Sequence, residues 1–173
     1  MLPDRGLRAL VTGGTGFVGS NIALRLVERG WRVLVLQRPD SSTELLEEGP
    51  FDFIHGDVLE PESLPAAMQN IDAVFHAAGV VDYWHQGVER MYAVNVEGTR
   101  NVAAAALQAG VPRLLHISST AAMGIYPDQV VDESFQFNVR PKDFVYGHSK
   151  YQAEQVIFEA VKAGLPAVIV NPT

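Results

Sequence analysis

The sequence has 173 residues, a length typical of one domain, and 47% of them are hydrophobic, which is enough to bury a sizeable core. Its formal net charge of −7 argues against a nucleic-acid or membrane-surface partner, because both would require a basic patch. The absence of cysteine excludes a disulfide framework and a thiolate metal site. No signal peptide is expected, and no apolar run approaches the ~20 residues of a membrane-spanning helix. We therefore expect a soluble, cytoplasmic α/β protein.

Six short apolar runs recur along the chain, and most are apolar throughout rather than alternating with polar residues. Such runs are typical of strands covered on both faces, and each is followed by a stretch with helical spacing. The predicted strands cover residues 9–11, 33–36, 51–54, 73–75, 114–117 and 167–170. Alternating strands and helices indicate βαβ units. The sequence therefore predicts an α/β fold, a doubly wound parallel sheet of six strands with helices on both faces.

Glycine and proline mark where three of the helices should end. Gly30, Gly110 and Gly164 each fall between a helical stretch and the next predicted strand. A glycine there can adopt the left-handed conformation that ends a helix, and a nearby proline cannot continue one. The clearest of these helices runs from about Glu89 to Gly110. No interdomain linker is visible, so one domain spanning residues 1–173 is predicted.

A glycine-rich segment, residues 12–19, lies between the first predicted strand and the first predicted helix. A nucleotide site needs a backbone that turns tightly, approaches a pyrophosphate closely and directs helix N-terminal N–H groups at it. Gly13 would make the turn, Gly16 would permit the close approach, and Gly19 would let the helix pack on the strand. A glycine turn without a ligand is the alternative, but the position between a strand and a helix favours a dinucleotide site.

Tyr146 and Lys150 are four residues apart in a stretch with helical spacing, so they would share one face of a helix. A free tyrosine has a pKa of about 10, and lowering it to ~7 requires roughly 4 kcal/mol of preference for the phenolate. The lysine ammonium and an oxidised nicotinamide are charges that could supply this preference. Tyr146 would then be a general acid/base. A solvated lysine that falls four residues from a half-buried tyrosine by chance is the alternative.

Two serines, Ser118 and Ser119, end the fifth predicted strand at the carboxyl edge of the sheet, where α/β proteins bind ligands. A hydroxyl there can orient a substrate carbonyl and share its developing charge. A serine that caps a helix or satisfies loop N–H groups is the alternative. The sequence alone leaves both serines as candidates.

These segments resemble the extended short-chain dehydrogenase/reductase family, also called the NAD-dependent epimerase/dehydratase superfamily, over essentially the whole chain. The motifs that carry the resemblance are the Gly-x-x-Gly-x-x-Gly spacing at Gly13, Gly16 and Gly19, Gly56-Asp57-Val58, His76-Ala77-Ala78-Gly79, Asn95-Val96-Glu97-Gly98-Thr99, Ser118-Ser119, Tyr146-Gly147-His148-Ser149-Lys150 and Asn171-Pro172. The family's Ser-Ser-x-x-x-x-Gly pattern ends at Gly124 and selects Ser119 over Ser118, with Thr120 as a weaker candidate.

The resemblance implies a Rossmann-type NAD(P)-binding domain and an oxidoreductase that transfers hydride reversibly at a carbonyl/alcohol carbon. In it, Ser119, Tyr146 and Lys150 would be catalytic, and Lys150 would also hydrogen-bond the nicotinamide ribose. The residues implied to contact the cofactor are Gly13, Thr15, Gly16, Phe17, Val18, Gly19, Arg38, Asp57, Val58, Ala77, Ala78, Gly79, Tyr146, Lys150 and Pro172. No metal site is expected, because the five histidines have no paired spacing.

The choice between NAD and NADP should depend on the end of the second predicted strand, about 20 residues beyond the glycines. Gln37 occupies the position of the acidic residue that would bind a ribose 2′-hydroxyl, and Arg38 follows it. A guanidinium can pair with a 2′-phosphate, and the missing carboxylate removes a repulsion. Ser41 and Ser42 could add hydroxyls. We favour NADP(H), with NAD(H) as the alternative if Arg38 is only a solvated loop residue.

Within the family, the 36–39 turn and the motifs at residues 95–99 and 118–119 are most similar to the dihydroflavonol-reductase-like and hydroxysteroid-dehydrogenase-like branch. A small-molecule carbonyl/alcohol substrate is favoured, and a nucleotide sugar that is epimerised or dehydrated is the alternative. Thr120-Ala121 stand where dehydratases of this type carry an Asp-Glu pair, which counts against dehydration. A non-catalytic dinucleotide sensor ranks lowest, because such a protein would have lost the tyrosine.

Other features carry weaker expectations. Extended members are usually about twice this long and their C-terminal part supplies most of the substrate pocket, so the chain is expected to be a fragment. A homodimer through the helices bearing Asn95 and Tyr146 is plausible for the family. Asn95 itself could serve a proton relay or simply bond a neighbouring strand. The aromatic segments 83–85 and 126–127 could line a substrate pocket or pack a loop.

Overall fold

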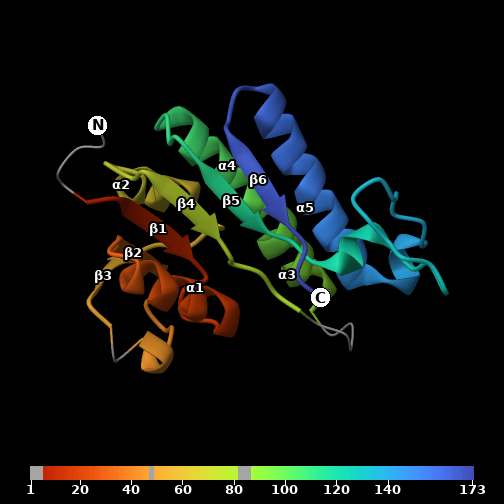
Figure 1. Cartoon of the computed structure of the whole chain (residues 1–173), viewed down its shortest axis with the longest axis horizontal. Helices are drawn as coiled ribbons and strands as arrows, with labels where there is room; N and C mark the ends of the chain where they lie inside the picture. The colour runs from red at the N-terminus through yellow and green to blue at the C-terminus, as the bar shows by residue number, and fades with distance from the viewer. Residues whose placement is uncertain (1–5, 47–48, 82–86) are drawn as a thin grey trace.

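The computed structural model describes residues 6–46, 49–81 and 87–173, which form one parallel sheet with helices on both faces (Figure 1). The strands are β1 (Arg8–Thr12), β2 (Arg32–Gln37), β3 (Phe51–His55), β4 (Ala73–His76), β5 (Leu114–Ile117) and β6 (Ala167–Val170). Their order in the sheet is β3-β2-β1-β4-β5-β6. All five neighbouring pairs are parallel. The predicted Rossmann-type doubly wound sheet is therefore confirmed.

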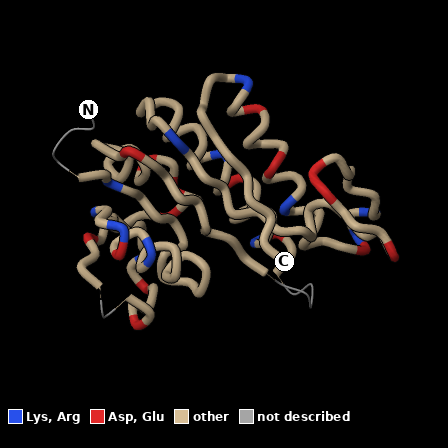
Figure 2. Tube along the Cα trace, viewed as in Figure 1, with Lys and Arg blue, Asp and Glu red and all other residues tan. Residues whose placement is uncertain are grey.

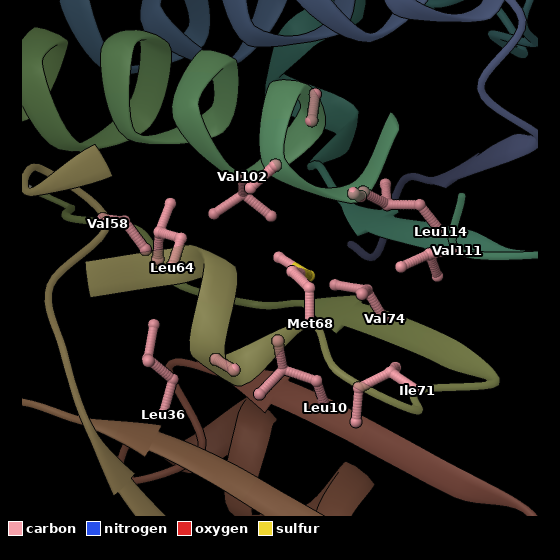
Figure 3. Close-up of a cluster of buried hydrophobic side chains, with 14 of the residues drawn as sticks. Leu10, Leu36, Val58, Leu64, Met68, Ile71, Val74, Val102, Val111 and Leu114 are labelled. Carbon is pink, nitrogen blue, oxygen red and sulfur yellow. The ribbon is translucent and has the colours of Figure 1, made fainter. Parts of the chain in front are cut away.

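Side chains alternate along the strands between two hydrophobic cores. On one face, Leu10, Val74 and Leu114 pack below α2 (Leu64–Ala67), α4 (Thr99–Gln108) and α5 (Val145–Lys162). Figure 3 shows these side chains facing Val102 of α4 and Met68 just beyond α2. On the other face, the neighbouring strand residues pack against α1 (Phe17–Glu28). Burial of each aliphatic side chain contributes about 1.5–3 kcal/mol to the stability of the fold. The two cores therefore hold the strand ends in place.

Three helix ends fall where glycine predicted them. Gly30, Gly110 and Gly164 have φ of +80°, +66° and +105°, in the left-handed region that favours glycine. Each N–H donates to a carbonyl of the preceding turn at 2.9–3.1 Å, which satisfies backbone acceptors at the helix end. The helices therefore stop one or two residues before the turn into the next strand.

The long helix predicted from Glu89 to Gly110 differs from expectation in its first half. It begins as α3 (Val88–Tyr92), continues as a π-helical segment (Ala93–Gly98), and becomes α-helical again as α4. Gly98 packs against Val58, because a Cβ on Gly98 would lie 2.7 Å from a Val58 methyl. Single π-helical turns inside α-helices are frequent at functional sites. This segment buries Asn95.

The two faces are not covered equally toward β6, which lies at one edge of the sheet. Val168 and Val170 are 59% and 37% exposed, whereas Ala9 and Val11 of β1 are fully buried. Figure 2 shows acidic and basic residues interspersed over the fold rather than gathered on one element. Among the described residues, no helix combines the length and apolar character needed to span a membrane.

Candidate functional site

The glycine segment makes the tight turn that the sequence predicted. Gly13 has a φ of +68°, and the Gly16 N–H donates to the Gly13 carbonyl at 3.0 Å. A Cβ on Gly13 would lie 2.5 Å from the Ala78 nitrogen, and a Cβ on Gly19 would overlap the Gly13 carbonyl. Only glycine fits at these two positions without displacing the backbone. The turn consequently packs directly against the segment that follows β4.

A cavity of about 270 Å³ lies at the carboxyl ends of β1, β2, β3 and β4. The strand order reverses between β1 and β4, and open α/β sheets bind ligands at such a point. Nine of the residues predicted to contact a cofactor line this cavity: Gly13, Thr15, Gly16, Arg38, Asp57, Val58, Ala77, Ala78 and Gly79. The structure thus brings four separate predicted loops around one space.

Other predicted cofactor residues lie outside the lining of that cavity. Phe17 and Val18 begin α1 and are 79% and 45% exposed. Gly19 is buried beneath the glycine turn. Pro172 follows β6, and its carbonyl accepts a hydrogen bond from the Thr120 N–H at 3.0 Å. Pro172 is therefore placed beside the segment that carries the serines.

Lys150 reaches from α5 to the end of β5. Its side chain is almost completely buried, and its Nζ donates to the Ile117 carbonyl at 2.8 Å. Burial lowers the pKa of Lys150 to about 8, and the Glu154 carboxylate opposes that change. Tyr146 lies four residues earlier, in the first turn of α5, and its backbone carbonyl accepts the Ser149 hydroxyl at 2.7 Å. The predicted pair is thus carried by one helix that abuts the strand end before the serines.

The two serines have different environments. The Ser118 side chain is buried, and its hydroxyl donates to Glu154 Oε1 at 2.5 Å. Ser119 lines a larger cavity of about 840 Å³ together with Thr120 and Tyr126, and its Oγ accepts the Ala121 N–H at 3.2 Å. Ser118 is therefore committed to a structural bond, whereas Ser119 faces a space that a substrate could enter. The sequence also allowed a serine that only caps a helix, and the bond from the Ala121 N–H to Ser119 Oγ is such a capping contact.

A buried polar layer lies between the sheet and the helices behind these residues. His76, at the end of β4, contacts the Thr12 hydroxyl at 2.7 Å through Nδ1 and the Thr99 hydroxyl at 2.9 Å through Nε2. The Thr99 hydroxyl donates to the Asn95 carbonyl at 2.6 Å, so its oxygen must accept from His76 Nε2–H. Thr12 then donates to Nδ1, which fixes His76 as the neutral Nε2–H tautomer. Burial, with a smaller effect of the Lys150 charge, lowers the pKa of His76 to about 3.

His116 lies beside His76 on the neighbouring strand, with ring centroids 5.2 Å apart. It is fully buried, and neither ring nitrogen has a hydrogen-bond partner among the described residues. Burial is the main cause that lowers the pKa of His116 well below its ordinary value, and His76 and Lys150 act in the same direction. Both histidines are therefore neutral at physiological pH.

The Asn95 side chain is fully used in structural bonds. Its Oδ1 accepts the Val80 N–H at 2.8 Å, and its Nδ2 donates to the Val80 carbonyl at 3.0 Å and to the Ser149 hydroxyl at 2.9 Å. The sequence allowed two roles for Asn95, a proton relay or a structural bond to a neighbouring strand. These contacts agree with a structural role. Asn95 ties the loop after β4 to α5.

The profile of the NAD dependent epimerase/dehydratase family matches residues 9–173, which is nearly the whole chain. The chain belongs to this family. The glycine segment and the Tyr146–Lys150 stretch are two of the motifs that carried the resemblance, and the structure places them in the turn after β1 and on α5.

Similar proteins of this family include both reductases and epimerases. A putative dihydroflavonol 4-reductase of Synechocystis is 42% identical over 164 residues, which cover 94% of this chain and 48% of the relative. The crystal structure of gox2253 is 41% identical with a TM-score of 0.85, and the match covers 95% of this chain and 50% of that one. UDP-glucose 4-epimerase of Thermus thermophilus, in complex with NAD, is 27% identical with a TM-score of 0.82, covering 95% and 54%. The chain spans about half the length of these relatives.

Sequence reasoning missed several residues that the structure places at these cavities or near Lys150. Arg90 of α3 lines the 270 Å³ cavity and a neighbouring one of about 560 Å³, and Arg38 and Asp57 line both as well. Glu154 binds Ser118, and His116 lies near Lys150. A signal for Glu154 existed, because it follows Lys150 by one helical turn. No comparable signal pointed to Arg90 or His116, since each depends on elements that meet only in the fold.

The aromatic segments and the absence of a metal site were weaker expectations from the sequence. Tyr126 and Pro127 line the 840 Å³ cavity with Ser119. The aromatic segment Tyr83-Trp84-His85 lies outside the described residues. Within the described part of the chain, no cluster of three histidine, aspartate or glutamate side chains could hold a metal ion.

Proposed function

We propose that this chain is the NAD(P)-binding domain, over residues 1–173, of an oxidoreductase that transfers hydride at a carbonyl/alcohol carbon. The observation that carries the proposal is the contact between Lys150 and the carbonyl of Ile117. It joins the helix that bears Tyr146 to the last residue of β5, two residues before Ser119. A phenol, an ammonium and a hydroxyl at one sheet edge are the groups that carbonyl reduction needs.

In the proposed mechanism, the glycine turn and the other residues that line the 270 Å³ cavity would hold a dinucleotide, whose nicotinamide would supply the hydride for reduction or accept it in oxidation. Tyr146 donates its proton to the carbonyl oxygen during reduction and takes it back during oxidation. Lys150 stabilises the phenolate through its charge, and Ser119 donates a hydrogen bond to the oxygen on which negative charge develops. The Ile117 carbonyl keeps the ammonium at the sheet edge.

The cofactor that we favour is NADP(H), with NAD(H) as the alternative. Arg38 and Ser41 both line the 270 Å³ cavity, at the end of β2 where the adenosine ribose is expected. A guanidinium with a nearby hydroxyl can bind a phosphate on that ribose. Titrating each dinucleotide separately against the purified chain tests this assignment, and tighter binding of NAD than of NADP would refute it.

Nucleotide-sugar epimerisation is the second candidate, because UDP-glucose 4-epimerase shares this fold and binds NAD. An epimerase returns the hydride to its substrate, so its turnover leaves the cofactor unchanged overall. Net consumption of NADPH with aldehydes or ketones would support the reductase, whereas interconversion of nucleotide sugars without net oxidation would support the epimerase. A small-molecule substrate is proposed in both cases.

Replacing Tyr146 by Phe tests the mechanism, because it removes only the hydroxyl that carries the proton. We expect turnover to be lost while dinucleotide binding is retained. Tyr151→Phe is the matched control, because Tyr151 is on the same helix, is not one of the proposed catalytic residues, and stacks its ring on Phe137. Unchanged turnover in Tyr146→Phe would exclude this chemistry, whereas dinucleotide binding without any turnover in the wild type would favour a sensor. The homodimer and the cytoplasmic location expected from the sequence stay predictions.

A further inference from the structure

Glu154 joins three elements at the carboxyl edge of the sheet. It lies on α5, and its Oε1 accepts the Ser118 hydroxyl at 2.5 Å and the Asn171 side-chain amide at 2.6 Å. Ser118 follows β5 and Asn171 follows β6. The same Asn171 amide also donates to the Ser119 carbonyl at 3.0 Å. One carboxylate therefore connects both strand ends to the helix and reaches the backbone of Ser119.

Two backbone bonds between the strand ends lie next to these side-chain contacts. The Ser118 N–H donates to the Val170 carbonyl at 2.8 Å, and the Thr120 N–H donates to the Pro172 carbonyl at 3.0 Å. Hydrogen bonds to an ionised acceptor are stronger than those between neutral groups. Loss of the carboxylate should therefore loosen these two backbone bonds more than bonds at the far end of β5.

Glu154 also follows Lys150 by one helical turn, so both side chains lie on the same side of α5. The other titratable groups near Lys150 are Tyr146 on the same helix, His76 on β4 and His116 on β5. Both histidines are neutral, because their pKa values are lowered, and Lys150 itself bonds to an uncharged carbonyl. Within the described chain, Glu154 is the carboxylate whose charge favours the buried ammonium.

We propose that Glu154 is a positioning residue that fixes the carboxyl ends of β5 and β6 against α5 and provides the counter-charge of Lys150. We assign it no contact with the reacting atoms, because its carboxylate bonds to Ser118 and Asn171. Its importance for catalysis rests on the proposed function, because it acts through Ser119 and Lys150. The contacts that it makes do not depend on that function and can be tested without a cofactor.

Two substitutions separate the two roles. Glu154→Gln keeps an oxygen that can accept both hydrogen bonds but removes the charge, whereas Glu154→Ala removes both. Glu159→Gln is the matched control, because Glu159 is an exposed residue of the same helix that pairs with Lys162. The chain has only three lysines, so lysine side-chain NMR signals can be assigned by replacing Lys142 and Lys162 with arginine.

The counter-charge is tested by titrating the Lys150 signal with pH. We expect Lys150 to titrate about one pH unit lower in Glu154→Gln than in wild type, since an opposite charge nearby favours the ammonium. Glu159→Gln should leave the Lys150 titration unchanged. An unchanged titration in Glu154→Gln, or an equal shift in Glu159→Gln, would overturn this role.

The positioning role is tested by amide hydrogen exchange at Ser118 and Thr120. We expect both amides to exchange about 10-fold faster in Glu154→Ala, with a smaller increase in Glu154→Gln, because the neutral amide oxygen still accepts both bonds but more weakly. The Leu114 amide, which bonds to the Pro166 carbonyl at the other end of β5, should keep its rate. No change at Ser118 and Thr120, or equal acceleration at Leu114, would overturn this role. Either result would leave the proposed function standing, because that function is tested separately by the turnover of Tyr146→Phe.

Discussion

Acidification should destabilise the folded chain through its buried histidines. The pKa of His76 is about 3 in the folded state and close to 6.5 when the chain is unfolded. Between these values the unfolded chain binds a proton that the folded chain excludes, so folding stability falls as pH falls. His116 adds a loss of the same sign, since its pKa is also lowered.

The size of the effect follows from the shift of His76. Each pKa unit corresponds to 1.36 kcal/mol. Integrated from pH 7 to pH 5, proton binding by unfolded His76 amounts to about 1.4 such units. Acidification over this range therefore lowers the free energy of unfolding by about 2 kcal/mol through His76 alone. Lys150 contributes nothing in this range, because it is protonated in both states below pH 8. Between pH 8 and its unfolded value of about 10.5, Lys150 should make stability rise with pH.

Urea unfolding at pH 7 and pH 5 measures this loss. His76→Gln provides the comparison, because glutamine does not titrate and can still bond to the Thr12 and Thr99 hydroxyls. Carboxylates titrate equally in both proteins and cancel in the difference. The wild type should lose about 2 kcal/mol more than His76→Gln on acidification. Equal losses in the two proteins would refute the assignment of His76 as a buried neutral residue.

Three further predictions concern other parts of the chain. His116→Leu should raise the free energy of unfolding by about 1 kcal/mol, because it removes two buried ring nitrogens that have no hydrogen-bond partner among the described residues. The Tm should then rise by about 2–4 °C. A lower Tm would mean that the ring nitrogens of His116 have a partner. Arg90→Ala should weaken NADPH binding about 10-fold with little change for NADH, while Arg100→Ala, an exposed residue paired with Glu97, should affect neither. Equal weakening of both dinucleotides would place Arg90 against their shared part. Val168→Thr should reduce self-association measured by light scattering, since Val168 is an exposed apolar residue of the edge strand.

The sheet could be predicted from the sequence because its signals are local. Strands covered on both faces are apolar without interruption, and a glycine such as Gly110 marks the helix end before the next strand. The turn at Gly13 was predictable for the same reason, because its left-handed conformation favours glycine. These features need no knowledge of what packs against them.

The connections behind the site could not be predicted in this way. The bond of Ser118 to Glu154 joins residues 36 positions apart, and the bond of His76 to Thr12 joins residues 64 apart. Nothing in the sequence near a serine or a histidine says which distant partner it meets. The preference for Ser119 over Ser118 came from the family pattern, and the structure supplies a physical reason, since the Ser118 hydroxyl already has an acceptor.

The buried polar layer adds directional hydrogen bonds to a core that is otherwise apolar. Burying His76 and Lys150 opposes folding, because polar groups lose water and a charge loses more. Each of these groups nevertheless has a single geometry in which its hydrogen bonds are satisfied, and a shifted helix would leave them unpaired at a cost of about 1–3 kcal/mol each. Hydrophobic contacts such as those of Val102 tolerate small displacements, whereas these bonds do not. The polar layer therefore holds α4 and α5 against the ends of β4 and β5 through directional bonds, at the expense of stability at low pH.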